Sequence, residues 1–422
     1  MSAVLGSAVS DDGIDLDAVQ AALRKTTETL AAELAAPGTV EPDWVEFEWW
    51  VARAAAVIHG VSPLLSRRLQ WRGPGGWWEF LNEQHTHARI RYLRTRELLE
   101  LIDAEARKAD LPLVPLKGAA LHSLGIYYAG DRPMADLDLL AGERDVLAVG
   151  ALLERLGFRQ KHATPRHQVF EPVHGMAPAS FGENSANPMK IELHSYIGEG
   201  LPLRTVDVTS RIFPRAPRAG LNAYPSTAAL MTHLVLHAAG AISCRAIRLV
   251  HLNDIARLSE RMTGADWDEL LSPGSVPNQP AWWAFPPLAL TARYYACIPE
   301  NVLAAAAERC QWVLKSVSRR RILSDVSLSD IWISAFPGAV WSRSLQEALT
   351  YAVHRVLPSA AHRSLRPVIA VAQPDASQVM PGTPGKSWTD LSQGRRILRW
   401  LTSRAPRPET LGPVRGALAQ WR

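Results

Sequence analysis

One short segment, residues 134–140, constrains the fold most, because it alternates with a period of two in a chain that elsewhere repeats its apolar residues at helix spacing. This alternation is typical of a β-strand, in which side chains two residues apart point to the same face. Asp136 and Asp138 therefore share one face, with their Cα atoms about 6.5 to 7 Å apart. Leu137 and Leu139 point the other way, into a core. The segment thus predicts a strand with one acidic face and one apolar face.

Further strands and helices are expected around this strand, between residues 111 and 225. Short apolar or alternating runs predict three more strands, at residues 113–116, 168–172 and 190–196. Helical spacing predicts two helices, at residues 119–127 and 146–156. Strands mixed with helices over only about ninety residues imply a small α/β unit.

The rest of the chain is predicted to be largely helical. Helical spacing covers residues 16–34 and 42–110, with a break at 72–76, and it returns from residue 226. The predicted fold class is α+β: a small mixed-sheet core embedded between helical domains, mostly helical overall. A chain of 422 residues is too long for one ordinary core. The expected parts are a helical region at 1–110, an α/β core at 111–225, a helical domain at 226–372, and a linker with a basic segment at 373–422.

Composition and charge exclude several classes of protein. No run of about twenty uncharged apolar residues occurs, so we expect no membrane span, and the acidic start of the chain is unlike a signal peptide. Three cysteines without metal-binding spacing predict reduced thiols and a cytoplasmic protein. The last thirty residues contain seven arginines and one acidic residue. This basic segment is interpreted either as a solvated surface or as a binding site for a polyanion such as RNA.

The acidic pair on the predicted strand indicates a metal site. Adjacent carboxylates repel each other unless cations lie between them. Asp136 and Asp138 can both reach metal ions about 3.5 to 4 Å apart, the spacing of a two-metal phosphoryl-transfer centre. An Asp-x-Asp pair alone is common on surface strands, but Glu192 on a second alternating segment offers a third carboxylate, with His194 on the same face. A carboxylate on a neighbouring strand can orient or deprotonate an attacking hydroxyl group.

A candidate phosphate site precedes the acidic strand. Lys117 and Gly118 stand at a predicted strand-to-helix turn, where bare backbone N–H groups and the helix dipole favour an anion. Glycine allows close approach, and the Lys117 side chain can meet the phosphate charge. Arg132, just before the acidic strand, has two interpretations: it clamps a phosphate, or it fixes the turn by pairing with Asp131 or a carbonyl oxygen.

Other polar residues have both a structural and a functional interpretation. His194 either contacts substrate or is satisfied by a neighbour. His233 and His237 have the i,i+4 spacing of a metal pair, but without a glutamate between them we favour histidines that fill or line the core. Asp254, inside an apolar helix, is expected to bond the backbone or Arg257, with a substrate role as the alternative.

Several motifs in the middle of the chain resemble one bacterial family. Residues 116–121 (LKGAAL) followed by 132–140 (RPMADLDLL) resemble the bacterial nucleotidyltransferase family with the LKG…R…DxDLL core, a divergent branch of the DNA polymerase β-like superfamily. The similarity continues at residues 57–65, 192–194, 234–237 and 249–256. It spans roughly residues 50–260, and no resemblance is found beyond residue 300.

The resemblance implies an enzyme that moves a nucleoside monophosphate from a nucleoside triphosphate (NTP) to an acceptor hydroxyl or phosphate group and releases pyrophosphate. The implied cofactors are two Mg²⁺ ions, with Mn²⁺ as an alternative. By position, Asp136 and Asp138 would bind both metal ions, while Glu192 would bind the catalytic metal ion and position the nucleophile. The residues implied to bind the nucleotide are Lys117, Gly118, Arg132 and His194.

The acceptor stays open at this point: a small molecule, a peptide or protein side chain, or an RNA end. A tailoring enzyme of natural-product or modified-peptide biosynthesis is the preferred interpretation. The alternatives are a tRNA-modifying nucleotidyltransferase of the toxin type and a non-catalytic NTP-binding or scaffold protein. Nothing in the sequence predicts the preferred base or the oligomeric state.

Overall fold

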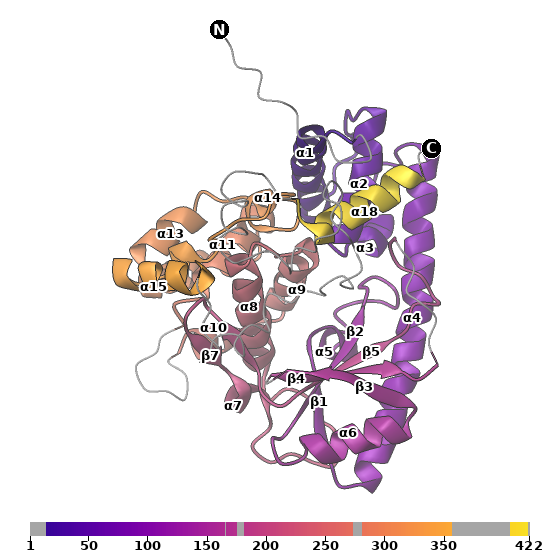
Figure 1. Cartoon of the computed structure of the whole chain (residues 1–422), viewed down its shortest axis with the longest axis vertical. Helices are drawn as coiled ribbons and strands as arrows, with labels where there is room; N and C mark the ends of the chain where they lie inside the picture. The colour runs from indigo at the N-terminus through magenta and orange to yellow at the C-terminus, as the bar shows by residue number, and fades with distance from the viewer. Residues whose placement is uncertain (1–13, 165, 175–180, 273–280, 357–405, 421–422) are drawn as a thin grey trace.

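The computed structural model of the chain describes residues 14–164, 166–174, 181–272, 281–356 and 406–420. Its fold class is α+β, as predicted, with a mixed six-stranded sheet among many helices (Figure 1). None of the described helices combines the length and the apolar content that a membrane crossing requires. The predicted linker and most of the basic segment lie outside the described residues.

Four helices precede the sheet and pack around a cluster of tryptophans. They are α1 (Leu16–Ala35), α2 (Glu46–Ile58), α3 (Ser62–Arg68) and α4 (Gly75–Lys108). The predicted break at residues 72–76 coincides with a loop only up to Pro74, because α4 already begins at Gly75. Ring centroids within the cluster lie 4.7–6.4 Å apart, and its members are Trp44, Trp49, Trp71 and Trp77. These aromatic contacts hold the helices together.

The sheet has the strand order β3-β4-β5-β2-β1-β8. Its strands are β1 (Pro112–Pro115), β2 (Asp136–Ala141), β3 (Phe158–Ala163), β4 (His167–Pro172), β5 (Lys190–His194) and β8 (Gly220–Leu221). β2 runs parallel to β5, and β1 runs parallel to β8, while the other neighbours are antiparallel. The four predicted strands are confirmed as β1, β2, β4 and β5. The sequence pattern does not predict β3, whose side chains after the first are all exposed, or β8, which has only two residues.

The two faces of the sheet have different surroundings. On the apolar face, Leu137 and Leu139 are fully buried among side chains of α4 and of α6 (Val146–Arg155). Figure 1 shows α4 running along the sheet. A helix that precedes all six strands in the sequence therefore covers one face of the sheet. The division of the chain into four domains stays a prediction.

The opposite face of the sheet is turned toward elements that follow in the chain. They are α5 (Lys117–Ser123), β6 (Gly198–Gly200), β7 (Thr205–Asp207), α7 (Thr209–Ile212), α8 (Thr227–Ser243) and α9 (Leu249–Ser259). Helix α8 contacts α5, α9 and β6, and therefore joins this face to the helices beyond it. The acidic side chains of β2 point to this side.

The described residues form two hydrophobic cores, and the remaining helices complete the larger one, which also contains the tryptophan cluster. They are α10 (Gly264–Leu271), α11 (Phe285–Tyr294), α12 (Glu300–Arg309), α13 (Trp312–Ser318), α14 (Leu323–Val326), η1 (Ala339–Trp341), α15 (Leu345–Val356) and α18 (Pro408–Ala419). Helix α18, yellow in Figure 1, packs against α2. Arg407 of the basic segment is buried and donates hydrogen bonds to the carbonyl oxygens of Trp332 (3.2 Å) and Arg245 (2.7 Å). This arginine joins the start of α18 to the segments around Arg245 and Trp332, and it is not part of a solvated surface.

Candidate active site

The register of two parallel strands brings the predicted acidic residues to one face. Asp138 of β2 lies opposite Glu192 of β5, and Leu140 lies opposite His194. Because side chains two residues apart share a face, Asp136, Asp138, Glu192 and His194 all project from the side that is not covered by α4 and α6. The local alternation that predicts each strand therefore also predicts this grouping.

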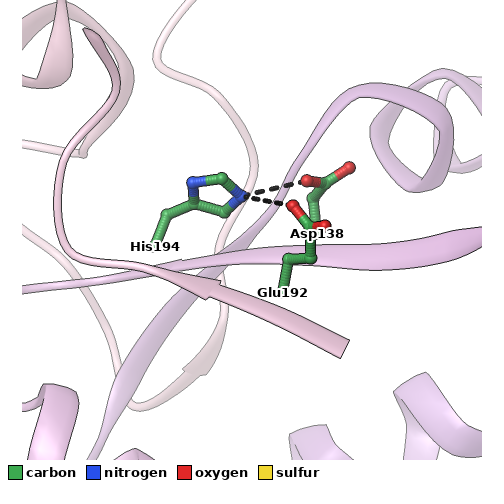
Figure 2. A group of neighbouring side chains, drawn as sticks. All are labelled: Asp138, Glu192 and His194. Atoms are coloured by element: carbon green, nitrogen blue, oxygen red, sulfur yellow. Dashed lines mark hydrogen bonds and ion pairs between the residues drawn. The ribbon is translucent and has the colours of Figure 1, made fainter. Parts of the chain in front are cut away.

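Three of these side chains come within contact distance of one another (Figure 2). The His194 Nε2 atom lies 3.0 Å from Asp138 Oδ1 and 3.7 Å from Glu192 Oε2. Asp138 and His194 are buried, whereas Glu192 is partly exposed. Figure 2 shows the imidazole edge facing both carboxyl groups.

Lys117 adds a positive charge to this group. Its Nζ atom donates a hydrogen bond to Asp138 Oδ1 at 3.0 Å. The residue opens α5 with a φ of +46°, a left-handed conformation that non-glycine residues adopt at a cost and that is concentrated at functional sites. Burial lowers the pKa of Lys117, but the charges of Asp138, Asp136 and Glu192 together raise it above its ordinary value. The ammonium group is therefore charged and serves as the counter-ion of Asp138.

Burial and mutual repulsion separate the pKa values of the three carboxyl groups. Burial, followed by the charge of Asp138, raises the pKa of Asp136. Burial and the charges of Asp138 and Asp136 raise the pKa of Glu192 to about 7. Burial disfavours the Asp138 carboxylate as well, but Lys117 and His194 outweigh it and hold the pKa well below its usual range. A further cation would favour the ionised form of all three carboxyl groups, because it would offset the repulsion that raises the pKa of Asp136 and of Glu192.

The donor atoms of the group fit a divalent metal ion. Asp138, Glu192 and His194 each offer one ligand atom, and these atoms all lie within 4.8 Å of one another. Carboxylate oxygens suit Mg²⁺ and Mn²⁺, and the imidazole nitrogen widens the choice toward softer ions. Asp136 projects from the same face but is not a member of this close group, so its predicted role as a metal ligand stays a prediction.

A second buried network fixes Arg132. Its Nε and Nη2 atoms donate to the two carboxylate oxygens of Asp254, both at 2.8 Å, and Tyr127 donates its hydroxyl to Asp254 Oδ1 at 2.8 Å. The expected partners of Asp254, the backbone or Arg257, are therefore wrong, because Arg132 and Tyr127, from the segment between α5 and β2, occupy both carboxylate oxygens. Arg132 pairs with Asp254 in place of Asp131, and it also donates to the carbonyl oxygen of Pro133 at 3.3 Å.

Gly118 is required by this arrangement. A Cβ atom at position 118 would lie only 2.2 Å from Arg132 Nη1. The missing side chain thus lets the guanidinium group reach the start of α5, beside Lys117. The predicted roles of Gly118 and Arg132 in nucleotide binding stay predictions, and the structure adds that the two residues depend on each other.

The two histidines of α8, His233 and His237, both have hydrogen-bond partners within the protein. His233 is buried, and its Nδ1 atom lies 2.8 Å from the Tyr224 hydroxyl. His237 Nδ1 lies 3.3 Å from Glu199, a buried residue of β6 that also accepts two hydrogen bonds from Arg166, at 2.8 and 3.1 Å. Local spacing does not predict the contacts of Glu199, which lies 38 residues from His237 and 33 from Arg166.

Metal-dependent phosphoryl-transfer enzymes typically have carboxylates on adjacent strands, a charged lysine beside them and a glycine at the turn, as found here. The chain belongs to a nucleotidyltransferase family: the family model described as "Uncharacterised nucleotidyltransferase" matches residues 45–274, more than half of the sequence. The match includes every strand of the sheet and all of the site residues above. No match is found among curated proteins or among solved structures. The family confirms the predicted class of transferase and indicates an NTP as substrate.

Proposed function

We propose that the protein is a metal-dependent nucleotidyltransferase that moves a nucleoside monophosphate from an NTP to an acceptor hydroxyl or phosphate group. The observation that carries this proposal is the register of β2 and β5, which sets Asp138 beside Glu192 with Lys117 bonded to the same carboxylate. We further propose that the chain uses the LKG…R…DxDLL core, in which Lys117, Asp136 and Asp138 have the roles that the resemblance implies.

The residues that would hold the metal ions are Asp136, Asp138 and Glu192, joined by His194. When bound, two Mg²⁺ ions, or Mn²⁺ as an alternative, would neutralise negative charge on the phosphate groups. The acidic residues then ionise together, because the charge that raises the pKa of Glu192 and Asp136 is compensated. Lys117 is released from its role as counter-ion and is available for the triphosphate.

The acceptor oxygen attacks the α-phosphorus of the NTP in line with the bond that breaks. A new bond forms between the acceptor oxygen and the α-phosphorus, while the bond to the bridging oxygen breaks and pyrophosphate leaves. The acceptor hydroxyl gives its proton to the Glu192 carboxylate, which lies beside Asp138 on the neighbouring strand. Lys117 and Arg132 bind the phosphates. Gly118 has no side chain, so the backbone N–H groups at the start of α5 can approach the phosphates closely.

We propose a small molecule or a peptide as the acceptor, as in a tailoring enzyme of natural-product or modified-peptide biosynthesis. The alternative, a tRNA end, depends on the basic segment, and Arg407 of that segment is already engaged with carbonyl oxygens of the protein itself. The acceptor can be identified by mass spectrometry, because a nucleotidylated product gains the mass of one nucleoside monophosphate.

The test is a transfer assay with each labelled NTP, Mg²⁺ and an extract of metabolites, peptides and RNA. The wild-type chain is expected to modify an acceptor and release pyrophosphate. Asp138→Asn should abolish transfer, and Asp43→Asn, an exposed aspartate remote from the site, serves as the matched control. Binding of Mg-NTP without pyrophosphate release by the wild type would instead support the non-catalytic alternative.

A further inference from the structure

Arg248, the residue before α9, is held by the turn between α2 and α3. Its Nε atom donates a hydrogen bond to the carbonyl oxygen of Ile58 at 2.8 Å. Gly60 in this turn has a φ of +65°, and a Cβ atom there would lie 2.7 Å from Arg248 Nη2. The guanidinium group therefore fills the space that glycine leaves open, and any larger residue would displace it.

His59 fixes the same turn to the start of α9. The His59 Nδ1 atom accepts a hydrogen bond from the Leu249 N–H at 3.0 Å, and the His59 carbonyl accepts one from the Val250 N–H at 3.2 Å. On the other side of the ring, Nε2 lies 2.8 Å from Ser329 Oγ. The first N–H groups of α9 are thus already used, so an anion near this point would meet the Arg248 side chain and not the helix end.

The charge of Arg248 lacks a direct counter-ion within the part of the chain that the structure describes. The other cations near the acidic group have close partners: Lys117 is bonded to Asp138, Arg132 to Asp254, and Arg166 to Glu199. No ion pair within 4 Å joins any described carboxylate to Arg248. The side chain is nevertheless partly buried, and the charges that act on it are those of Glu183, Arg132, Asp136 and Asp254, of which Asp136 belongs to the proposed metal site.

We infer that Arg248 binds the terminal phosphates of the NTP, and that the turn of Ile58, His59 and Gly60 positions its guanidinium group for this contact. The inference rests on the proposed nucleotidyltransferase function. A guanidinium group offers parallel N–H donors that match two phosphate oxygens, and a partly buried arginine is poorly solvated before the anion arrives. The carboxylates whose charges act on Arg248 are Glu183, Asp136 and Asp254, and Asp136 is the first residue of the acidic strand β2.

The phosphate contact can be measured apart from catalysis, by calorimetric titration of the full chain with inorganic tripolyphosphate in the presence of Mg²⁺. Arg248→Met is expected to weaken binding about ten- to hundredfold, the range for loss of a charge-assisted bidentate contact. Arg248→Lys should recover only part of this loss. Arg257→Met, on the helix α9 that Arg248 precedes but paired with Glu260, is the matched control and should bind as the wild type does.

The positioning role of the turn has its own test. Gly60→Ala should weaken tripolyphosphate binding in the wild-type background and add little in the Arg248→Met background, because the two changes affect one contact. Thermal unfolding of each variant shows whether the chain is still folded. Equal further weakening in both backgrounds would overturn the positioning role of Gly60.

Kinetic measurements separate this inference from the proposed function. If Arg248→Met raises the KM for the NTP but not for the acceptor, the contact is with the nucleotide as inferred. If the wild type transfers nucleotide and Arg248→Met keeps both the wild-type KM and the wild-type affinity for tripolyphosphate, the inference is overturned while the proposed function stands. If tripolyphosphate binds through Arg248 but no NTP is turned over, the anion site stands and the proposed function fails.

Discussion

The buried carboxylate of Asp254 provides a quantitative test of how the site is supported. Its two oxygens accept hydrogen bonds from Arg132 Nε, Arg132 Nη2 and the Tyr127 hydroxyl, each at 2.8 Å. The side chain is almost fully buried, as is most of the Arg132 side chain. Replacing Asp254 by alanine therefore leaves a guanidinium group inside the protein with one remaining contact, the carbonyl oxygen of Pro133.

The size of the effect follows from this environment. Removing one partner of a buried ion pair costs about 3 to 5 kcal/mol, because the charge that remains is not solvated. We expect Asp254→Ala to lower the free energy of unfolding by this amount. In the double variant Arg132→Met/Asp254→Leu, no charge is left buried, so it should be more stable than Asp254→Ala alone.

The assay is equilibrium unfolding of the full chain in urea, followed by tryptophan fluorescence. Asp268→Ala, an exposed aspartate on α10, is the control and should change the free energy of unfolding by less than about 0.5 kcal/mol. A loss below about 1 kcal/mol for Asp254→Ala, the value of an exposed ion pair, would refute the reasoning. So would a double variant that is no more stable than the single one.

Three further predictions concern the acidic group and the turn beside it. Glu192 has a pKa of about 7 and must be ionised to bind a cation, so Mn²⁺ affinity measured by electron paramagnetic resonance should rise as the pH increases through 7, and Glu192→Gln should flatten this rise. Lys117→Met removes the cation bonded to Asp138, so Mn²⁺ should bind roughly tenfold more tightly without nucleotide while the KM for the NTP increases; unchanged Mn²⁺ affinity would contradict the counter-ion role. Gly118→Ala forces a Cβ atom against Arg132 and should lower the free energy of unfolding by about 1 to 3 kcal/mol, which thermal denaturation can check.

The parts of the site that the sequence predicts are those with a local pattern. The alternation around Asp138 and around Glu192 assigns each carboxylate to a strand face, and strand pairing then brings them together. Lys117 and Gly118 follow from the short apolar run and the turn before the helix. Local spacing does not give the distance between Asp136 and the close group, because that depends on rotamers and on the neighbouring charges.

The parts that sequence patterns miss depend on contacts between distant segments. Arg132 meets Asp254 across 122 residues, and Arg248 meets Ile58 across 190, so no spacing rule connects either pair. The edge strand β3 lacks an apolar face, since every side chain after Phe158 is exposed. Its polar sequence therefore resembles a loop.

The contact between α18 and α2 links the end of the described chain to the active-site region. Four side chains of α18 are buried in the larger core: Leu411, Val414, Ala417 and Leu418. Helix α2 ends at Ile58, whose carbonyl oxygen holds Arg248. A tag, protease cut or deletion that displaces α18 is therefore expected to affect Arg248 through a single helix, α2. Loss of activity in a shortened protein would then reflect a weakened contact between Ile58 and Arg248, even with every proposed catalytic side chain still present.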